Sequence, residues 1–251
     1  MRRLWDRFYP STPGVCKTLW TTFILGRTIG RIMEINNNRH FRRLSRQLLA
    51  LRDKVVGIAF PKMARVKQIT VYNCGPAVLA TLYSFLGVKA SQRGIIASLR
   101  VQNKIKNVGM SMKDLGRGSH IIGKGAFVFW KKNRAKMSDV ETILKKYKYP
   151  VGVEWQGVFY EDADEDDGHY AVITEVNKGS GFLRIADPFY KFAGVDRRFR
   201  IKDFIKRWWD INEVHIAGTS KKRNIVDRRV MFVITPEGET FPNKVGMTRV
   251  K

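Results

Sequence analysis

The stretch that decides the fold runs from Val66 to Gly87 and has the sequence VKQITVYNCGPAVLATLYSFLG. Pro76 suits the first turn of a helix, where a missing N–H costs nothing, and Gly87 suits the left-handed residue that ends one. Apolar residues recur between them at helical spacing: Val78, Leu82, Phe85 and Leu86. The stretch therefore predicts a helix that begins near Cys74 and turns one apolar stripe toward a core.

Cys74 is expected at the N-terminus of this helix. Unpaired backbone N–H groups and the positive end of the helix dipole favour the thiolate there, which is the nucleophilic form of the side chain. A lone cysteine beside an apolar helix is more often a small buried hydrophobic residue, and the local sequence leaves that alternative open. Gln68 lies six positions upstream, where an extended segment can bring its amide beside the sulfur as an oxyanion donor.

From Pro150 onward the apolar pattern changes from helical spacing to alternation. This pattern predicts strands over 151–155, 169–176 and 182–187, the last two joined by a turn-rich connection. Helices followed by strands predict an α+β fold with an N-terminal helical half and a C-terminal antiparallel sheet half. The glycines at 109, 116, 118, 123 and 125 are interpreted as turns within the helical half.

The predicted hairpin brings a histidine and an aspartate together. If it folds about Lys178, His169 and Asp187 face one another across adjacent strands, and a shift of one residue would separate them. Asp187 can then hold one imidazole nitrogen and leave the other facing Cys74, as in acyl-transfer sites. Taken singly, a core histidine and a turn-capping carboxylate before Pro188 would be the simpler interpretations.

The motifs of this chain resemble those of the C39 family of papain-like cysteine peptidases: Gln68, Cys74-Gly75-Pro76-Ala77, Gly168-His169-Tyr170-Ala171-Val172 and Ala186-Asp187-Pro188. The resemblance runs from about Ala59 to the Trp208-Trp209 region. It implies a papain-like fold with Cys74 as nucleophile, His169 as general acid/base, Asp187 as its orienter and Gln68 as oxyanion donor. It also implies a peptide or protein substrate, with leader or precursor processing among the options, and no metal or organic cofactor.

The net charge of +25, from 47 Lys and Arg against 22 Asp and Glu, predicts a cationic surface. Residues 1–56 are predicted to form a basic helical extension, 57–235 the C39-like domain and 236–251 a peripheral tail. The extension can meet an anionic partner, either nucleic acid or a membrane surface, or its apolar stripe can pack on the domain. The alternative function is therefore a basic nucleic-acid-associated or particle structural protein on a papain-like scaffold.

Only Cys16 and Cys74 are present, too few for a disulfide framework or a cysteine-based metal site. No run of about 18 to 20 uncharged apolar residues predicts a transmembrane segment, and a cytoplasmic location is expected. Residues 161–167 form the one acidic run, EDADEDD. Such runs are usually solvated loops, although this one can also attract basic substrate residues or bind a cation.

Overall fold

The computed structural model describes residues 59–159, 168–215, 219 and 222–250. The chain divides into two compact units, Met1–Ile58 and Ala59–Lys251, and every described residue belongs to the second. The predicted extension 1–56 and the acidic run 161–167 lie outside the described residues. Among the residues that are described, no helix is long and apolar enough to cross a membrane.

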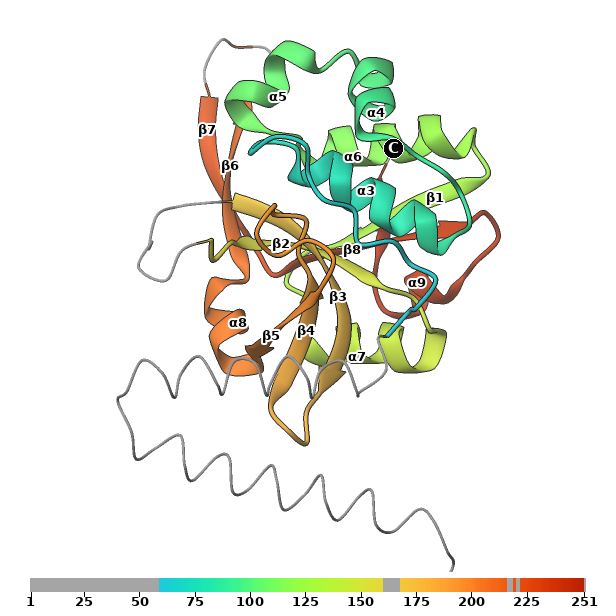
Figure 1. Cartoon of the computed structure of the whole chain (residues 1–251), viewed down its shortest axis with the longest axis vertical. Helices are drawn as coiled ribbons and strands as arrows, with labels where there is room; N and C mark the ends of the chain where they lie inside the picture. Colours follow the sequence, from blue (N-terminus) through green and yellow to red (C-terminus); the bar gives the residue numbers. More distant parts are fainter. Residues whose placement is uncertain (1–58, 160–167, 216–218, 220–221, 251) are drawn as a thin grey trace, which may run out of the picture. The chain divides into compact units, whose positions relative to one another are not determined.

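A seven-stranded sheet in the order β5-β4-β3-β2-β8-β1-β9 forms the centre of the second unit (Figure 1). Each strand is antiparallel to its neighbours. The strands are β1 (Phe127–Lys132), β2 (Val151–Gln156), β3 (Gly168–Asn177), β4 (Phe182–Ala186), β5 (Asp196–Arg200), β8 (Val230–Pro236) and β9 (Thr248–Arg249). A separate two-stranded ribbon is made by β6 (Trp209–His215) and β7 (Lys222–Arg228). The predicted α+β class with an antiparallel sheet is confirmed.

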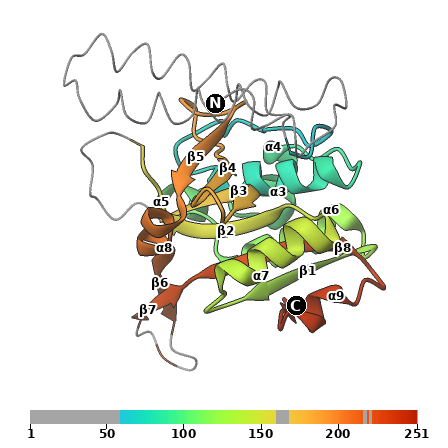
Figure 2. The same cartoon turned by 90° about the horizontal axis from the view of Figure 1, so that it is seen from below.

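Helices cover both faces of this sheet. The first four are α3 (Cys74–Phe85), α4 (Gln92–Leu99), α5 (Gln102–Val108) and α6 (Met112–Gly123). The remainder are α7 (Met137–Thr142), which continues as a π-helix η2 (Ile143–Tyr147), then α8 (Ile201–Arg207) and α9 (Phe241–Lys244). In Figure 1, α3 to α6 lie above the middle of the sheet and α7 and α8 below it, and Figure 2 shows the same arrangement from below.

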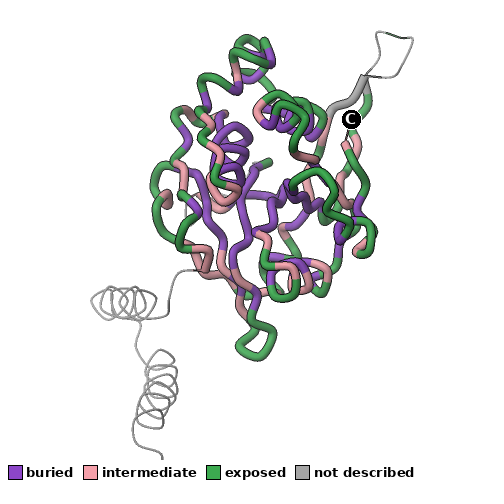
Figure 3. Tube along the Cα trace, turned by 90° about the vertical axis from the view of Figure 1, so that its right-hand side faces the viewer, coloured by how far each residue is buried: buried purple, intermediate pink, exposed green. Residues whose placement is uncertain are grey.

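Alternation along the strands supplies two hydrophobic cores. Val172 on β3 and Phe232 on β8 pack with α3, α4 and α6, whereas Ile173 and Trp155 pack with η2 and α8 on the other face. Figure 3 shows the result, with buried residues concentrated in the interior of the unit and exposed residues in the outer loops.

The helix predicted at Cys74 is confirmed, and α3 begins at that residue. Its ten residues from Cys74 to Tyr83 are all buried, so the helix is enclosed by protein and does not present a single apolar stripe. Gly87 follows it with a φ of 75°, the left-handed conformation that glycine adopts without strain. The helix α3 therefore lies in the interior of the unit, with Cys74 in its first turn.

The interpretation of all five glycines as turns is wrong for Gly116 and Gly118, which lie inside α6, and for Gly123, which is its last residue. A Cβ at Gly118 would stand 3.1 Å from Leu79 and 3.2 Å from Leu99, and one at Gly116 would stand 2.7 Å from Val250. These glycines therefore let α6 approach its neighbours closely. Ser111 caps this helix, and Asp114 closes the capping box.

Residues 236–251 were expected to form a peripheral tail, and the structure corrects this. Their short strand β9 pairs with β1 at the edge of the seven-stranded sheet. Phe241 and Met247 are buried in the core that contains η2. The turn-rich sequence of this segment predicts a peripheral position, but two of its apolar side chains are part of a core.

A buried carboxyl joins the sheet to the β6–β7 ribbon. Glu154 on β2 is 2% exposed and accepts a hydrogen bond of 2.7 Å from the hydroxyl of Tyr170 and one of 3.4 Å from the amide of Asn212 on β6. Burial raises the pKa of Glu154 to about 7, and the charges of Asp210 and Asp227 add to the rise. The carboxyl therefore retains its proton over a wider pH range in the folded chain than in the unfolded chain.

Replacing this carboxyl should change how stability depends on pH. The folded pKa lies above the ordinary value of 4.5, so the contribution of Glu154 is present below about pH 4.5 and declines as the pH rises to about 7. We expect Glu154→Gln to gain stability relative to wild type across that interval, by up to about 3 kcal/mol. Urea unfolding at a series of pH values measures the difference. The raised pKa of Glu154 would be contradicted if the free energies of unfolding of wild type and Glu154→Gln changed with pH in parallel. It would also be contradicted if Glu239→Gln, a variant at an exposed position, gained the same stability over this interval.

Candidate active site

Cys74 occupies the first position of α3 and is 8% exposed. Ala77 is the first residue whose N–H joins the helical ladder, with a bond of 3.1 Å to the carbonyl of Asn73. The N–H groups that precede it have no partner within the helix, and Pro76 has none to offer. The sulfur is thus attached where backbone donors and the helix dipole favour a negative charge.

His169 and Asp187 are joined by a hydrogen bond of 2.9 Å between Nε2 and Oδ1. His169 is the second residue of β3, and Asp187 directly follows β4. Both are 3% exposed. The same Oδ1 accepts a bond of 2.9 Å from the N–H of Phe189, which fixes the carboxylate within its own loop. One imidazole nitrogen is therefore fully engaged, and Nδ1 remains for another partner.

The expected strand register was wrong by two residues. Val172 pairs with Ala186, so Asp187 comes level with Ala171 and not with His169. A β-bulge between Ile173 and Glu175 shifts the pairing of β3 and β4. Since the error is an even number of residues, Asp187 keeps the face of the sheet on which His169 lies, and the two side chains meet diagonally.

The electrostatic environment of His169 includes both Asp187 and Cys74. Burial alone would lower its pKa, but its interactions with these two side chains outweigh burial and raise the pKa to about 9. Imidazolium is therefore the prevailing form at neutral pH. Three of the predicted residues, Cys74, His169 and Asp187, are coupled in this way.

Arg197 on β5 was not anticipated from the sequence. Its Nη1 donates a bond of 2.6 Å to Oδ2 of Asp187, and its Nη2 donates one of 2.8 Å to the carbonyl of Val158. Its guanidinium also lies over the ring of Phe192, 3.5 Å from the centroid. Burial would raise the pKa of Asp187, but the hydrogen bond with His169 and the charges of His169 and Arg197 lower it.

The sequence signal for Arg197 was weak, because it lies in the run Asp196-Arg197-Arg198-Phe199-Arg200 of a strongly basic chain. Such a run is usually a solvated face. Alternation along a strand places Arg197 and Phe199 on the opposite side from Arg198, and this was the one available clue. Arg197 is the residue that completes the shell around Asp187.

Gln68 is buried in the loop before Cys74, as the sequence places it, but its amide is already occupied. Nε2 donates to the carbonyls of Thr70 at 2.9 Å and Val71 at 3.0 Å. Its backbone N–H donates to the carbonyl of Pro188 at 2.8 Å, which ties the Cys74 loop to the Asp187 loop. In this arrangement Gln68 holds the two loops together, and both of its amide hydrogens are engaged.

Three buried polar atoms of the same loop have no hydrogen-bond partner within the described chain: Gln68 Oε1, Thr70 Oγ1 and Asn73 Oδ1. Buried polar groups are nearly always paired, so such a group of acceptors next to a candidate nucleophile needs an explanation. Ile69 and Val71 on this loop and Tyr190 on the Asp187 loop are exposed apolar side chains. The neighbourhood of Cys74 thus offers both acceptors and apolar surface.

No His, Cys, Asp and Glu residues within the described ranges are grouped so that three or more could hold a metal ion. A sulfur at a helix N-terminus, an imidazole that carries a proton and a carboxylate that orients it can together perform nucleophilic acyl transfer.

No family model matches the chain, and no curated protein matches its sequence. Among solved structures, it is similar to the peptidase domain of Streptococcus ComA, a bi-functional ABC transporter involved in a quorum-sensing pathway. The identity is 19%, the match covers 68% of this chain and 97% of that one, and the TM-score is 0.46. At this level of similarity the match carries no argument about function.

The coupling of the three side chains can be tested by titrating the His169 ring. In Asp187→Asn the pKa should fall from about 9 toward or below the ordinary value of 6.5, because burial then outweighs the remaining interaction. In Cys74→Ala it should also fall, by a smaller amount. Imidazole NMR between about pH 5 and 10 measures both, with His120→Gln to help assign the signals. An unchanged pKa in Cys74→Ala would show that the sulfur is not beside the ring.

Proposed function

We propose that this protein is a cysteine peptidase in which Cys74 is the nucleophile, His169 the general acid/base and Asp187 the residue that orients the imidazole. The proposal rests chiefly on one observation: a buried imidazole, held by a carboxylate, has its pKa raised to about 9 by that carboxylate and by a cysteine at a helix N-terminus. This arrangement places a protonated imidazole beside the candidate nucleophile at neutral pH. The resemblance of the motifs to the C39 family agrees with it.

The reaction would proceed in two halves. The Cys74 thiolate attacks the carbonyl carbon of a peptide bond, a C–S bond forms, and the carbonyl electron pair moves to oxygen. The His169 imidazolium then donates its proton to the departing nitrogen as the C–N bond breaks, leaving a thioester. Neutral His169 next takes a proton from water, whose oxygen attacks the thioester. The C–S bond breaks, and a carboxylic acid and the Cys74 thiolate result.

Gln68 is proposed as an oxyanion donor, with a condition that follows from its contacts. Both of its amide hydrogens bind the carbonyls of Thr70 and Val71, so one of these bonds must be exchanged for a bond to the oxyanion. The backbone N–H of Cys74 at the start of α3 needs no such exchange. We therefore assign the first oxyanion bond to that N–H and the second to Gln68.

A polypeptide substrate suits the surroundings of Cys74. Ile69 and Val71 on the loop before Cys74 and Tyr190 on the Asp187 loop are exposed and can contact apolar side chains of a substrate. Leader or precursor processing within the C39 pattern stays part of this proposal.

The alternative of a nucleic-acid-associated or particle protein rests on the net charge and on residues 1–56, which lie outside the described residues. No contact among the described residues favours a nucleic acid in preference to a peptide. We therefore do not propose it.

Peptidase activity should depend on Cys74 and not on the second cysteine. We expect Cys74→Ala to lower kcat/KM by at least about 1000-fold and Cys16→Ala to leave it unchanged, because the nucleophile is lost only in the former. Mass spectrometry of new peptide termini from a mixture of unfolded polypeptides measures cleavage, and alkylation rates measure the reactivity of each thiol. Equal cleavage by the two variants would refute the assignment.

The pH dependence of cleavage should report His169. Its raised pKa keeps the proton in place below about pH 9, so kcat/KM should decline only above about pH 9 as the imidazolium is lost. In Asp187→Asn the alkaline decline should begin at lower pH, together with a lower maximal rate. Rates with a fluorogenic peptide over the alkaline range supply the measurement. A decline that remains near pH 9 in this variant would remove Asp187 from its assigned role.

A further inference from the structure

The helix α3 ends at a cavity that the proposed chemistry does not use. Phe85 is the last residue of α3, whose first residue is Cys74, and it lines a hollow of about 630 Å³. A helix of this length places its two ends about 17 Å apart. The volume falls within the range of about 300–1,000 Å³ that is usual for small-molecule sites. Every lining residue belongs to the second compact unit.

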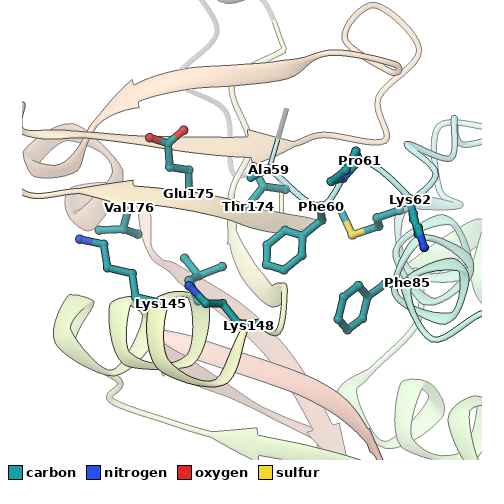
Figure 4. A pocket seen from close by; sticks show the side chains of 12 residues that line it. Ala59, Phe60, Pro61, Lys62, Phe85, Lys145, Lys148, Thr174, Glu175 and Val176 are labelled. Atoms are coloured by element: carbon teal, nitrogen blue, oxygen red, sulfur yellow. The ribbon is translucent and has the colours of Figure 1, made fainter. Parts of the chain in front are cut away.

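The floor and walls of this cavity are mainly apolar. Phe60 and Phe85 meet edge to face with their ring centroids 5.4 Å apart, and the side chains of Met63, Leu144 and Val176 are buried around them. Figure 4 shows the two rings beside each other at one side of the hollow. Such walls suit an aliphatic or aromatic body more than a polar one.

The opposite side of the cavity is cationic. Lys145 and Lys148 are exposed and extend over the hollow from η2, as Figure 4 shows. The acidic wall residue Glu175 is neutralised by Arg184, with Nε of the arginine 2.9 Å from its carboxylate. Glu141 lies 2.7 Å from Lys145, but no acidic partner of Lys148 occurs among the described residues. Lys62, an exposed lining residue near Phe60, adds a third positive charge, so the cavity combines apolar walls with an excess of positive charge at its rim.

The backbone that presents these lysines is unusual. Residues 143–147 form a π-helix, and Lys148 closes it with a φ of 60°. π-Helical turns are rare and occur frequently at functional sites, whereas the left-handed residue that ends the turn is shared with α4 and α6, which end at Arg100 and Lys124. The wide turn and its left-handed end bring Leu144, Lys145 and Lys148 to the same cavity.

We infer that this cavity is a binding site for an amphipathic anion with an aliphatic chain and one anionic head group, the chemistry of a fatty acid. The chain would lie against Phe60 and Phe85 and displace water from the apolar walls. The head group would face Lys148 and Lys145 at the rim. This inference stands apart from the proposed peptidase activity, because it uses none of its residues.

Calorimetric titration of the full chain with monomeric dodecanoate tests the inference. We expect one molecule bound per chain, affinity at least tenfold weaker in Lys145→Gln/Lys148→Gln, and no change in Lys106→Gln/Lys113→Gln. The latter pair alters the same net charge at exposed positions elsewhere. Ala59→Trp, which fills the cavity without altering charge, should weaken binding by a similar factor. Thermal unfolding of each variant confirms that it remains folded.

Several results would overturn the inference. Equal weakening by the control pair would mean that dodecanoate senses only the net charge of +25. Equal affinity for dodecyltrimethylammonium would remove the lysines from the site, and equal affinity for acetate would remove the apolar walls. Binding only to anionic vesicles, or displacement of dodecanoate by an acidic peptide at lower concentration, would replace the fatty-acid site with a membrane or peptide surface.

Discussion

The site depends on one buried carboxylate that must be fully satisfied. Asp187 lies in the interior, where an unpaired charge is costly, and it is stabilised by three donors: the His169 ring, the N–H of Phe189 and the Arg197 guanidinium. Each donor comes from a different place, namely β3, the loop after β4, and β5. Satisfying this single charge therefore fixes three segments relative to one another, and the orientation of the imidazole follows from it.

A β-bulge makes this arrangement geometrically possible. Near the turn, Asn177 pairs with Phe182, and without an extra residue this register would bring Asp187 level with Val172. Val172 faces the α3 core, on the opposite side of β3 from His169. The bulge moves Asp187 level with Ala171 and so restores the shared face. A one-residue irregularity thus decides whether the histidine and the aspartate meet.

Much of this could be predicted from local sequence, and the remainder depended on contacts between distant segments. Pro76, Gly87 and the apolar spacing predict α3, and alternation predicts β2 to β4, because these signals are properties of one segment. The bulge leaves no such signal, since the run Ile173-Thr174-Glu175-Val176 holds no glycine and is mostly β-branched, as in an ordinary strand. Arg197 could not be distinguished from its neighbouring arginines in the sequence. Gly118 was interpreted as a turn residue because the sequence does not show that its Cα lies too close to Leu79 for a side chain. The occupied amide of Gln68 likewise depends on how the loop folds.

The two buried carboxyls Asp187 and Glu154 are the same chemical group, but their surroundings shift their pKa values in opposite directions. Asp187 has two cationic neighbours, which lower its pKa, whereas Glu154 is buried near Asp210 and Asp227, and its pKa is raised. Glu154 binds the hydroxyl of Tyr170, whose ring would lie 3.5 Å from a Cβ added at Gly75, the residue after Cys74.

A second full negative charge on that side would oppose a thiolate at position 74. Because the pKa of Glu154 is about 7, much of its charge is suppressed near neutral pH, while Asp187 is ionised where it can hold the imidazolium. The fold thus shifts the pKa values of the two acids in opposite directions, through burial, hydrogen bonds and neighbouring charges.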